Sequence, residues 1–449
     1  MSSSHAVPLP ASPLSPSAGT HGAHPANSAA AASLAPGDIA VGVVIGRASE
    51  YFDFFVYGIA SVLVFPAVFF PFLDPLQGTL WAFALLALAF VVRPIGTVAG
   101  MQLQRRFGRA AKLAAALFLL GTSTVGIALL PGYESAGATA IALLALFRVG
   151  QGLALGGSWD GLPSLLALNA PARRRGSYAM LAQLGAPFGL LVACALFAFL
   201  WSQLSSADFL AWGWRYPFFA AFAINVVALF ARLRLVVTHE YERELEAREL
   251  EPCATRELFA RQGHNVVLGA FAALAPFALF HLVTVFPLSW IALYEPRDIG
   301  PFLAIELAGA ALAALAMPVS GWIADRIGRR RTLGALAVAI ALFAIATPWL
   351  LGGGEAGQDA FILLGFLLLG LSYAQSAGAL TSNFPTAFRY TGAALTADLA
   401  WLIGAAFAPL VVLALSARFG LGAVSLYLLS GALCTLLALR TNRWLALRD

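Results

Sequence analysis

The chain has 449 residues, of which 60% are apolar and 11% are charged, and its mean hydropathy is +0.82. A soluble protein of this length would need many more polar residues to cover its surface. The composition therefore excludes soluble domains and predicts an all-α integral membrane protein whose main partner is the lipid bilayer. The net charge of +5 is spread between the apolar runs and forms no single block, which argues against a nucleic-acid partner.

The apolar residues form twelve stretches, each long enough to cross a hydrocarbon layer of about 30 Å. They cover residues 41–70, 79–101, 112–130, 137–166, 176–202, 212–237, 264–293, 298–323, 333–352, 359–381, 390–417 and 420–440. Before them, a stretch rich in Ser, Ala, Pro and Gly predicts a disordered tail. The expected organisation is a tail at 1–39, a six-helix bundle at 40–237, a cytoplasmic linker at 238–263, a second six-helix bundle at 264–440 and a tail at 441–449.

The basic residues predict the topology. With the N-terminus inside, 21 of the 27 Arg and Lys residues fall on that side, and only Arg215, Arg297 and Arg418 fall on the opposite face. Short cytoplasmic loops retain positive charge, so the pattern predicts a multi-pass protein of a bacterial inner membrane with both termini in the cytoplasm. The three remaining arginines fall within or at the ends of predicted spans: Arg47, Arg93 and Arg148.

A basic turn recurs in the two halves, as Phe107-Gly108-Arg109 and as Ile327-Gly328-Arg329. The longer segment Gly321-Trp-Ile-Ala-Asp325-Arg326-Ile-Gly328-Arg329-Arg330-Arg331 resembles the signature between neighbouring helices of the major facilitator superfamily. Glycine allows the tight turn, and an aspartate there can pair with arginines or face a helix N-terminus when a gate closes. The resemblance implies the major facilitator fold, with twelve transmembrane helices in two pseudo-symmetric six-helix bundles around a central cavity.

Four further motifs narrow the resemblance. They are Glu50-Tyr-Phe-Asp53-Phe-Phe-Val-Tyr57-Gly58, Arg93-Pro94-Ile-Gly96, Arg148-x-x-Gln151-Gly152-x-x-x-Gly156-Gly157 and Phe384-Pro385-Thr386-x-x-Arg389-Tyr390-x-Gly392. Together they resemble the metabolite:proton symporter family, which includes permeases for proline/betaine, alpha-ketoglutarate, citrate and shikimate. The resemblance implies secondary active transport, with a proton gradient as the energy source and no cofactor. The expected gate residues are Asp325, Arg326, Arg329, Arg93 and Arg109.

The chain departs from the family pattern at four positions. Arg105 stands where most relatives have an aspartate in the first-half turn, so gate pairing there must differ. Ser158 replaces the glutamate of the fourth-helix motif, and Asp160 places an acid two residues later. Arg47 replaces a small or amide residue of the first helix. These changes leave the substrate and the proton coupling open.

The first predicted helix carries the candidates for proton coupling. An ionised side chain at the centre of a membrane helix costs about 2.5 kcal/mol or more, so an acid there usually has a partner or a role. Arg47, Glu50 and Asp53 are three residues apart and would form a ladder along one side of the helix. Coupling requires a desolvated carboxyl group near a cation, and we assign that role to Asp53 first and Glu50 second. The alternative is that both acids neutralise Arg47 or cap a broken turn.

Candidates for substrate binding follow from the same reasoning. Arg148 is suited to a carboxylate because its guanidinium donates two parallel hydrogen bonds, and Gln151 and Ser158 lie on the same side of that helix. The other candidates are Arg47, Tyr57 and a polar stripe on helix ten with Gln375, Ser376 and Asn383. Interhelical hydrogen bonding is the alternative for Arg148 and for the stripe. Further buried charges are Asp160, His281, Glu306 and Asp398, and His281 is either a proton relay or a hydrogen-bonded core histidine.

We therefore expect a monomeric transporter that takes up a small organic metabolite, with a carboxylate favoured, together with a proton. The alternatives are a zwitterionic osmolyte symporter, an exporter of an amphipathic compound or drug, and a non-transporting membrane sensor. No phosphate-binding loop or nucleophile–base set stands out, so neither ATP-driven transport nor enzyme activity is expected. Cys194, Cys253 and Cys434 have no metal-ligand or disulfide spacing, so no metal site is expected.

Overall fold

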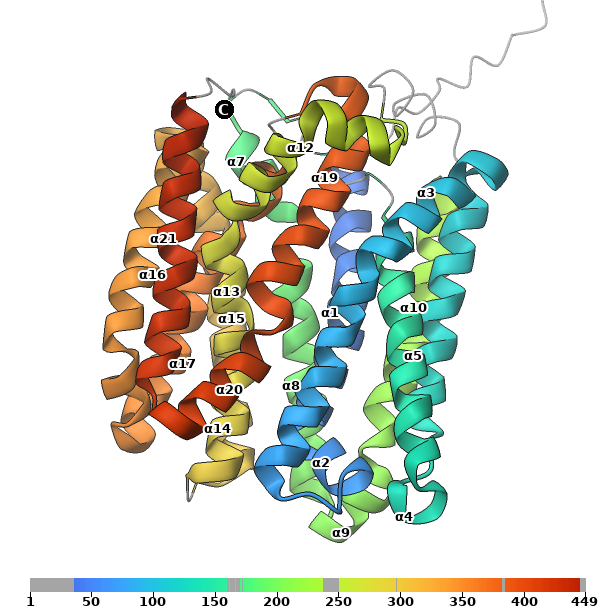
Figure 1. Ribbon diagram of the computed structural model, residues 1–449, viewed down its shortest axis with the longest axis vertical. Coiled ribbons are helices and arrows are strands. Elements are labelled where there is room, and N and C mark those ends of the chain that lie inside the picture. Colours follow the sequence, from blue (N-terminus) through green and yellow to red (C-terminus); the bar gives the residue numbers. More distant parts are fainter. Residues whose placement is uncertain are drawn as a thin grey trace, which may run out of the picture. The chain divides into compact units, whose positions relative to one another are not determined.

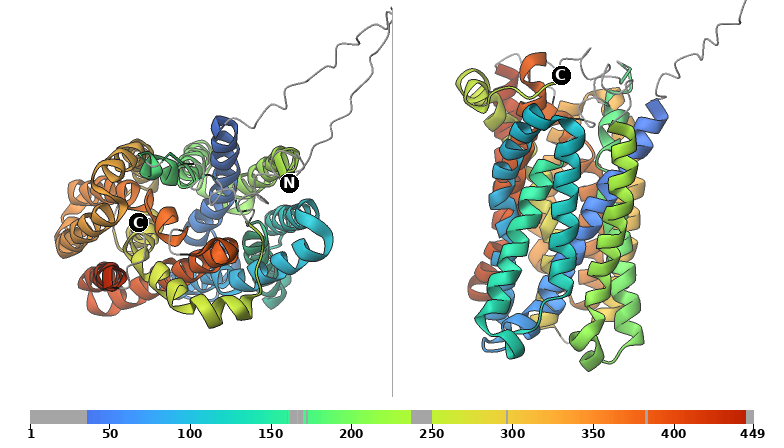
Figure 2. Two further views of the ribbon diagram at one scale, coloured as in Figure 1. Left: turned by 90° about the horizontal axis from the view of Figure 1, so that it is seen from above. Right: turned by 90° about the vertical axis from the view of Figure 1, so that its right-hand side faces the viewer.

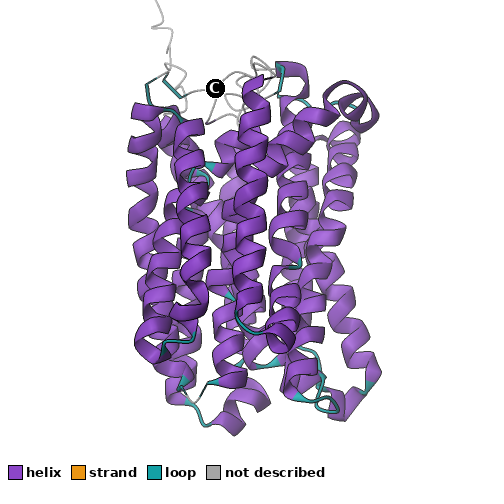
Figure 3. Cartoon of the chain, turned by 60° about the vertical axis from the view of Figure 1, so that its left-hand side comes forward, coloured by secondary structure: helices purple, strands orange, loops and turns teal. Residues whose placement is uncertain are grey.

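The computed structural model describes residues 36–159, 161, 166, 170–171, 173–236, 250–295, 297–381 and 384–444. Every regular element in these ranges is a helix (Figure 3). The expectation of an all-α protein is confirmed for this part of the chain.

The first half contains α1 (Pro36–Leu63), α2 (Phe65–Phe69), α3 (Pro75–Ala128), α4 (Tyr133–Ala136), α5 (Ala138–Gly157), α7 (Arg175–Leu181), α8 (Gly185–Gln203), α9 (Ser206–Asp208), the π-helical turn η1 (Phe209–Gly213) and α10 (Arg215–Val236). The 54 residues of α3 would extend about 80 Å at 1.5 Å per residue, far more than one span needs. At Gly108 the backbone has φ 85°, which only glycine adopts at little cost, and the helix turns back on itself. Two of the predicted spans therefore lie in α3, one on each side of this turn.

The second half contains α12 (Thr255–Ala272), α13 (Leu274–Thr284), α14 (Phe286–Tyr294), α15 (Ile299–Ile327), α16 (Arg329–Leu351), α17 (Gly354–Tyr373), α18 (Ser376–Thr381), α19 (Thr386–Ala400), the π-helical turn η2 (Trp401–Ala406), α20 (Ala408–Phe419) and α21 (Gly422–Trp444). The turn between α15 and α16 repeats the geometry of the first half, because Gly328 has φ 88°. The recurring Gly-Arg motif thus marks the same structural turn twice.

Within the described residues, ten helical stretches are long and apolar enough to cross a membrane. One of them is α3, which supplies two spans. The first helix, α1, is absent from these ten because Arg47, Glu50 and Asp53 fall in its middle and lower its apolar character. Adding α1 and dividing α3 gives the twelve spans that the sequence predicts.

Several boundaries differ from those predicted. Helix α12 begins at Thr255, inside the predicted linker, because its first turns are polar and hydropathy does not detect them. Helix α5 ends at Gly157, before the predicted residue 166, and two consecutive glycines favour an end there. Most of the predicted linker and the first 35 residues lie outside the described part of the chain.

The two halves meet along several helix pairs. Helices α7 and α8 pack against α15, and α3 packs against α19 and η2. The bend of α3, α12 and the end of the described C-terminal helix lie at the upper end in Figure 1, whereas α2, α4, α9 and α14 lie at the lower end. Seen from above, α1 lies between the cyan helices of the first half and the orange helices of the second (Figure 2). We call the upper end, which carries the two Gly-Arg turns, the arginine-rich face.

Close packing of α3 and α5 depends on glycine. A Cβ atom at Gly156 would lie 2.1 Å from the carbonyl oxygen of Arg93, which is backbone and cannot move aside. We expect Gly156→Val to force the two helices apart and to lower the thermal stability of the purified protein, at a cost of about 1–3 kcal/mol or more. In Gly334→Val, a control with the same change in helix propensity, the added Cβ atom meets only Leu439 at 3.9 Å. Equal melting temperatures for the two variants would contradict this packing.

Candidate functional site

A cavity of about 70 Å³ lies between the two halves. Its walls come from α1, α3, α5, α13, α17, α19, η2 and the segments around α7 and α18. The polar lining residues are Arg47, Glu50, Tyr51, Arg93, Trp159, Gln183 and Tyr373, and the aromatic ones include Phe54, Phe90, Phe277 and Trp401. A lining that combines aromatic side chains with a few polar and charged groups is typical of sites that bind small molecules.

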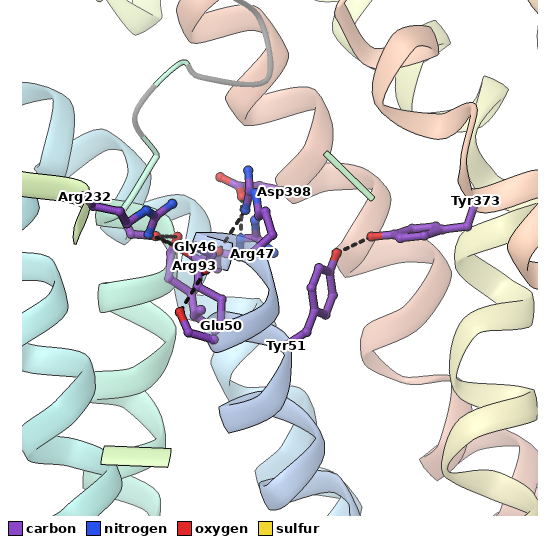
Figure 4. A network of polar contacts seen from close by, with 11 residues as sticks. Gly46, Arg47, Glu50, Tyr51, Arg93, Arg232, Tyr373 and Asp398 are labelled. Carbon is purple, nitrogen blue, oxygen red and sulfur yellow. Dashed lines mark hydrogen bonds and ion pairs between the residues drawn. The ribbon is translucent and has the colours of Figure 1, made fainter. Parts of the chain in front are cut away.

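Glu50 is the centre of a charged cluster on the first-half wall of the cavity (Figure 4). Its side chain is almost fully buried, with 6% of the residue exposed. Arg232 Nη1 of α10 donates to Oε1 at 2.6 Å, and Arg47 Nη1 of α1 donates to Oε2 at 2.9 Å. The Ser158 hydroxyl, at the end of α5, donates to Oε1 at 3.1 Å. One carboxylate thus holds two guanidinium groups.

A second ion pair joins the two halves beside the cavity. Arg93 of α3 lies 2.8 Å, Nε to Oδ1, from Asp398 of α19. The hydroxyl of Thr97, one turn after Arg93, donates to the other carboxylate oxygen at 2.5 Å. The hydroxyl groups of Tyr51 and Tyr373 share a further hydrogen bond between the halves (Figure 4). Arg93, which the sequence assigned to the gate, therefore lies in the cavity wall.

Guanidinium groups and an indole N–H supply hydrogen-bond donors at the cavity. Three guanidinium groups, those of Arg47, Arg93 and Arg232, stand against the two carboxylates of Glu50 and Asp398. Arg47 and Arg93 line the cavity itself, so two guanidinium groups face its interior from α1 and α3. The indole N–H of Trp159, which also lines the cavity, is buried and has no acceptor among the described residues. Both features suit a ligand that accepts hydrogen bonds and carries negative charge.

Asp53 belongs to a separate cluster within the first half. It is 2% exposed and accepts hydrogen bonds from the Thr124 hydroxyl at 2.8 and 2.9 Å, from Asn225 at 3.2 Å and from Gln151 at 3.3 Å. These four residues come from α1, α3, α5 and α10. These three hydrogen-bond partners are uncharged, so the ladder of Arg47, Glu50 and Asp53 predicted for α1 divides into two clusters.

Arg148 lies behind this cluster and is absent from the cavity lining. Its guanidinium donates to Gln151 Oε1 and to the carbonyl oxygen of Leu86, both at 3.0 Å. It also stacks on the ring of Tyr57, with 3.9 Å between Cζ and the ring centroid. The three predicted binding residues Arg148, Gln151 and Tyr57 are therefore brought together, at a place that the cavity does not reach in this conformation.

Asp325 joins the two halves at the arginine-rich face. Its Oδ1 accepts from the backbone N–H of Gly176 at 2.6 Å, and its Oδ2 accepts from the hydroxyl of Ser177 at 2.5 Å. Gly176 and Ser177 belong to α7, in the other half of the protein. The other predicted gate residues at this end have local contacts. Arg326 stacks on Trp322, and Arg329 packs against Gly378 of α18. Arg109 donates a hydrogen bond to Glu251 at 2.5 Å.

The corresponding contact of the first half has a different chemistry. Arg105, which replaces the usual aspartate, donates to the carbonyl oxygen of Pro252 at 3.0 Å. The halves are instead joined by Tyr390 of α19, whose hydroxyl accepts from Lys112 Nζ at 3.0 Å and donates to Gln104 Oε1 at 2.9 Å. The backbone carbonyl of Trp159 accepts hydrogen bonds from both Lys112 and Tyr390. We call Gln104, Lys112 and Tyr390 the first-half latch.

The first-half latch leads to a prediction. Tyr390→Phe removes hydrogen bonds worth about 0.5–1.5 kcal/mol each without changing volume, so the arginine-rich face should open more often. A cysteine placed at Ala393 in the cavity wall, in a background without the natural cysteines, should then react roughly 2- to 12-fold faster with a water-soluble thiol reagent. The control is Tyr427→Phe, because that hydroxyl donates to Gly404 within the second half. Equal reaction rates in the two variants would count against the latch.

The remaining predicted residues lie as follows. Gln375 Nε2 donates to Gly176 O at 3.4 Å and to Ser320 Oγ at 3.3 Å, and Ser376 accepts from the cavity residue Gln183 at 2.8 Å. His281 is hydrogen-bonded to the carbonyl oxygen of Ala405 at 2.7 Å and stacks on Phe54. Glu306 is buried between α15 and α8. Asp160 and Asn383 lie outside the described residues.

Sequence reasoning missed Arg232, Thr97, Lys112 and Tyr390 as site residues. Arg232 and Lys112 were counted as topology signals of the arginine-rich face, yet both are buried. A signal was present for Arg232, because Asn225 lies seven residues before it in the apolar middle of the helix, and that spacing places both on one face. Lys112 could have been singled out because it is the single lysine of the chain.

Comparisons with known proteins agree with this architecture. Residues 54–409 match the family model of the Major Facilitator Superfamily. The chain is 39% identical over 407 residues to the inner membrane metabolite transport protein YhjE of Escherichia coli (strain K12), covering 89% of this chain and 92% of the relative. It is 30% identical over 410 residues to the shikimate transporter of the same strain, covering 88% and 91%. With that strain's proline/betaine transporter the identity is 27% over 384 residues, covering 80% and 74%.

Among solved structures, the partially occluded inward-open form of the xylose transporter XylE from E. coli has a similar fold. The TM-score is 0.68 with 17% sequence identity, and the match covers 92% of this chain and 98% of that chain. The two bundles and the cavity between them define a multi-pass membrane transporter, not an enzyme. The chain belongs to the major facilitator superfamily. Its relatives place it in the metabolite:proton symporter family, as the helix motifs indicated.

Proposed function

We propose that this transporter takes up a small organic metabolite carrying a carboxylate, coupled to protons, by alternating opening of the two bundles. The observation that carries the proposal is that two arginines, Arg47 and Arg93, line the cavity wall, and Arg232 stands behind Glu50. In a site shielded from water, guanidinium groups in the wall favour an anionic ligand, and a planar guanidinium suits a carboxylate in particular. A relative that is a shikimate transporter supports this substrate class.

Alternating opening is supported by contacts between the halves on both sides of the cavity. Asp325 and the first-half latch join them toward the arginine-rich face. Toward the other face, stacked aromatic pairs join them, with Phe54 on His281 and Phe55 on Phe280. Opening one set while the other stays closed gives access from one side at a time. We propose that the arginine-rich face is cytoplasmic, because short inner loops retain positive charge.

For proton coupling we propose Asp53. It is a buried carboxyl group hydrogen-bonded to a hydroxyl and two amides, and these can hydrogen-bond either its charged or its protonated form. Glu50 is less suited, because two arginines hold it as a carboxylate. The cycle then needs no cofactor, and the monomer suffices because both cavity walls come from one chain.

A second candidate substrate is a zwitterion with a quaternary ammonium group. The cavity lining includes Trp159, Trp401, Tyr51 and several phenylalanines, and such rings attract quaternary cations through cation–π interactions. The ammonium group would face the rings while the carboxylate faces Arg47 or Arg93. Relatives that are proline/betaine transporters support this candidate.

Uptake by proteoliposomes tests both candidates. Labelled mono-, di- and tricarboxylates, betaines and amino acids are offered with and without an inward proton gradient. We expect a carboxylate without an ammonium group to accumulate, and only with the gradient. Accumulation of betaines but not of carboxylates would favour the second candidate, and uptake indifferent to the gradient would contradict proton coupling.

A further inference from the structure

One acidic side chain of the interface between the halves belongs to neither the cavity nor the Asp53 cluster. Glu306 lies seven residues after α15 begins, and none of its surface is exposed. Across the interface, the thiol of Cys194 on α8 is its hydrogen-bond donor, with 3.9 Å between Sγ and Oε2. The other carboxyl oxygen, Oε1, has no partner within the described part of the chain.

No cation reaches Glu306 from the described residues of the helices packed against α15. Those helices carry the titratable groups Arg175, Tyr178, Cys194, Tyr294, Arg329, Arg330, Arg331, Glu355, Asp359 and Tyr373. The arginines of α7 and α16 adjoin the end of α15 near Arg326, 20 residues from Glu306 or about 30 Å along the helix. At the other end, Asp359 is paired with Arg297 at 2.6 Å.

The remaining groups of this set are engaged elsewhere. The ring of Tyr294 packs at a tilt against that of Trp290, and Tyr373 is hydrogen-bonded to Tyr51. Glu355 lies in the exposed first turn of α17. Among the described residues of the neighbouring helices, Cys194 is therefore the single titratable side chain that contacts Glu306.

The protonation state of Glu306 follows from this environment. A carboxylate buried in a membrane helix without a cation costs several kcal/mol, and a thiol is only a weak donor to it. A neutral carboxyl group avoids the buried charge, and its Oε2 still accepts from the thiol. Glu306 therefore carries its proton while α8 and α15 are packed together.

We propose that Glu306 is a second proton-binding site, occupied when α8 and α15 are packed and released when they separate. On separation, water enters between the helices, the O–H bond of Glu306 breaks and the proton passes to that water. Repacking takes up one proton. The closed interface is thereby favoured at low pH and weakened at high pH. This inference is independent of the substrate and of the role of Asp53.

Infrared spectroscopy of the full-length protein in lipid bilayers tests the proposal directly, because a protonated carboxyl group has its own C=O stretching band. We expect Glu306→Gln to lose such a band at neutral pH, and Glu134→Gln, which changes an exposed acid, to keep it. Cys194→Ala should shift the Glu306 band to higher frequency, since it removes the hydrogen-bond donor. Identical carboxyl bands in wild type and Glu306→Gln would overturn the proposal. A Glu306 band unmoved in Cys194→Ala would overturn the pairing.

Hydrogen–deuterium exchange measures the conformational consequence. After correction for the intrinsic pH dependence of exchange, raising the pH should speed exchange in peptides from α8 and α15 of the wild type. Glu306→Gln should lose this pH effect, because glutamine cannot ionise. The same pH effect in both proteins would overturn the coupling of the proton to helix separation.

Discussion

Asp53→Asn is expected to abolish the accumulation of substrate against its gradient while exchange of substrate across the membrane continues. The asparagine keeps the size of the side chain and can still hydrogen-bond to Thr124 and Asn225, so the fold and the cavity should persist. It cannot bind and release a proton, so an inward proton gradient can no longer drive uptake. The measurement compares uptake under a pH gradient with counterflow under equal pH, both in proteoliposomes.

The control for this prediction is Asp208→Asn, an equivalent change at an exposed acid of α9. It should leave both accumulation and counterflow unchanged. If the Asp53 variant still concentrates substrate, the coupling proton must bind elsewhere. If it loses counterflow as well, Asp53 is needed for movement of the halves and not for coupling alone.

The second large effect is expected when Arg93, which forms an ion pair with Asp398 beside the cavity, is substituted. Arg93→Gln removes one positive charge from the cavity wall and leaves Asp398 buried without its partner. The lost charge should raise the apparent KM for a carboxylate roughly 10- to 150-fold, the range for hydrogen bonds to charged groups. The unpaired acid should also destabilise the contact between α3 and α19 by about 3–5 kcal/mol.

The double variant Arg93→Gln, Asp398→Asn separates these two effects. It leaves no unpaired charge, so thermal stability should largely return while the KM stays high. The matched control is Arg297→Gln with Asp359→Asn, an ion pair at 2.6 Å that is absent from the cavity lining. A KM in the double variant equal to that of the wild type would show that Arg93 does not contact substrate.

Much of the fold could be predicted because membrane spans are long and uniform. Eleven of the twelve expected spans lie in stretches whose apolar composition alone identifies them, two of them in the single helix α3. Helix α1 is different, since Arg47, Glu50 and Asp53 make it less apolar, but the apolar residues around them still predicted a span at 41–70. The start of α12 was missed because an amphipathic turn at a membrane face has no hydropathy signal.

The site could be predicted only in part, because spacing along one helix gives the direction of a side chain but not what lies opposite. Arg148 and Gln151 were expected on one side of α5, and they are hydrogen-bonded to each other. The sequence did not show that α1 places Asp53 next to Arg148 and Gln151. In that position the Arg148 guanidinium lies away from the cavity. Likewise, the partners of Arg93 and of Glu50 lie 305 and 182 residues away in the sequence, Asp398 and Arg232.

The most direct test of proton-coupled transport is to measure proton entry and substrate entry together. Proteoliposomes enclosing a pH-sensitive dye receive a labelled carboxylate, without an imposed gradient. We expect the interior to acidify when the carboxylate enters, in the wild type and not in Asp53→Asn. Entry of the carboxylate without acidification of the interior would contradict a carrier that moves its substrate together with a proton.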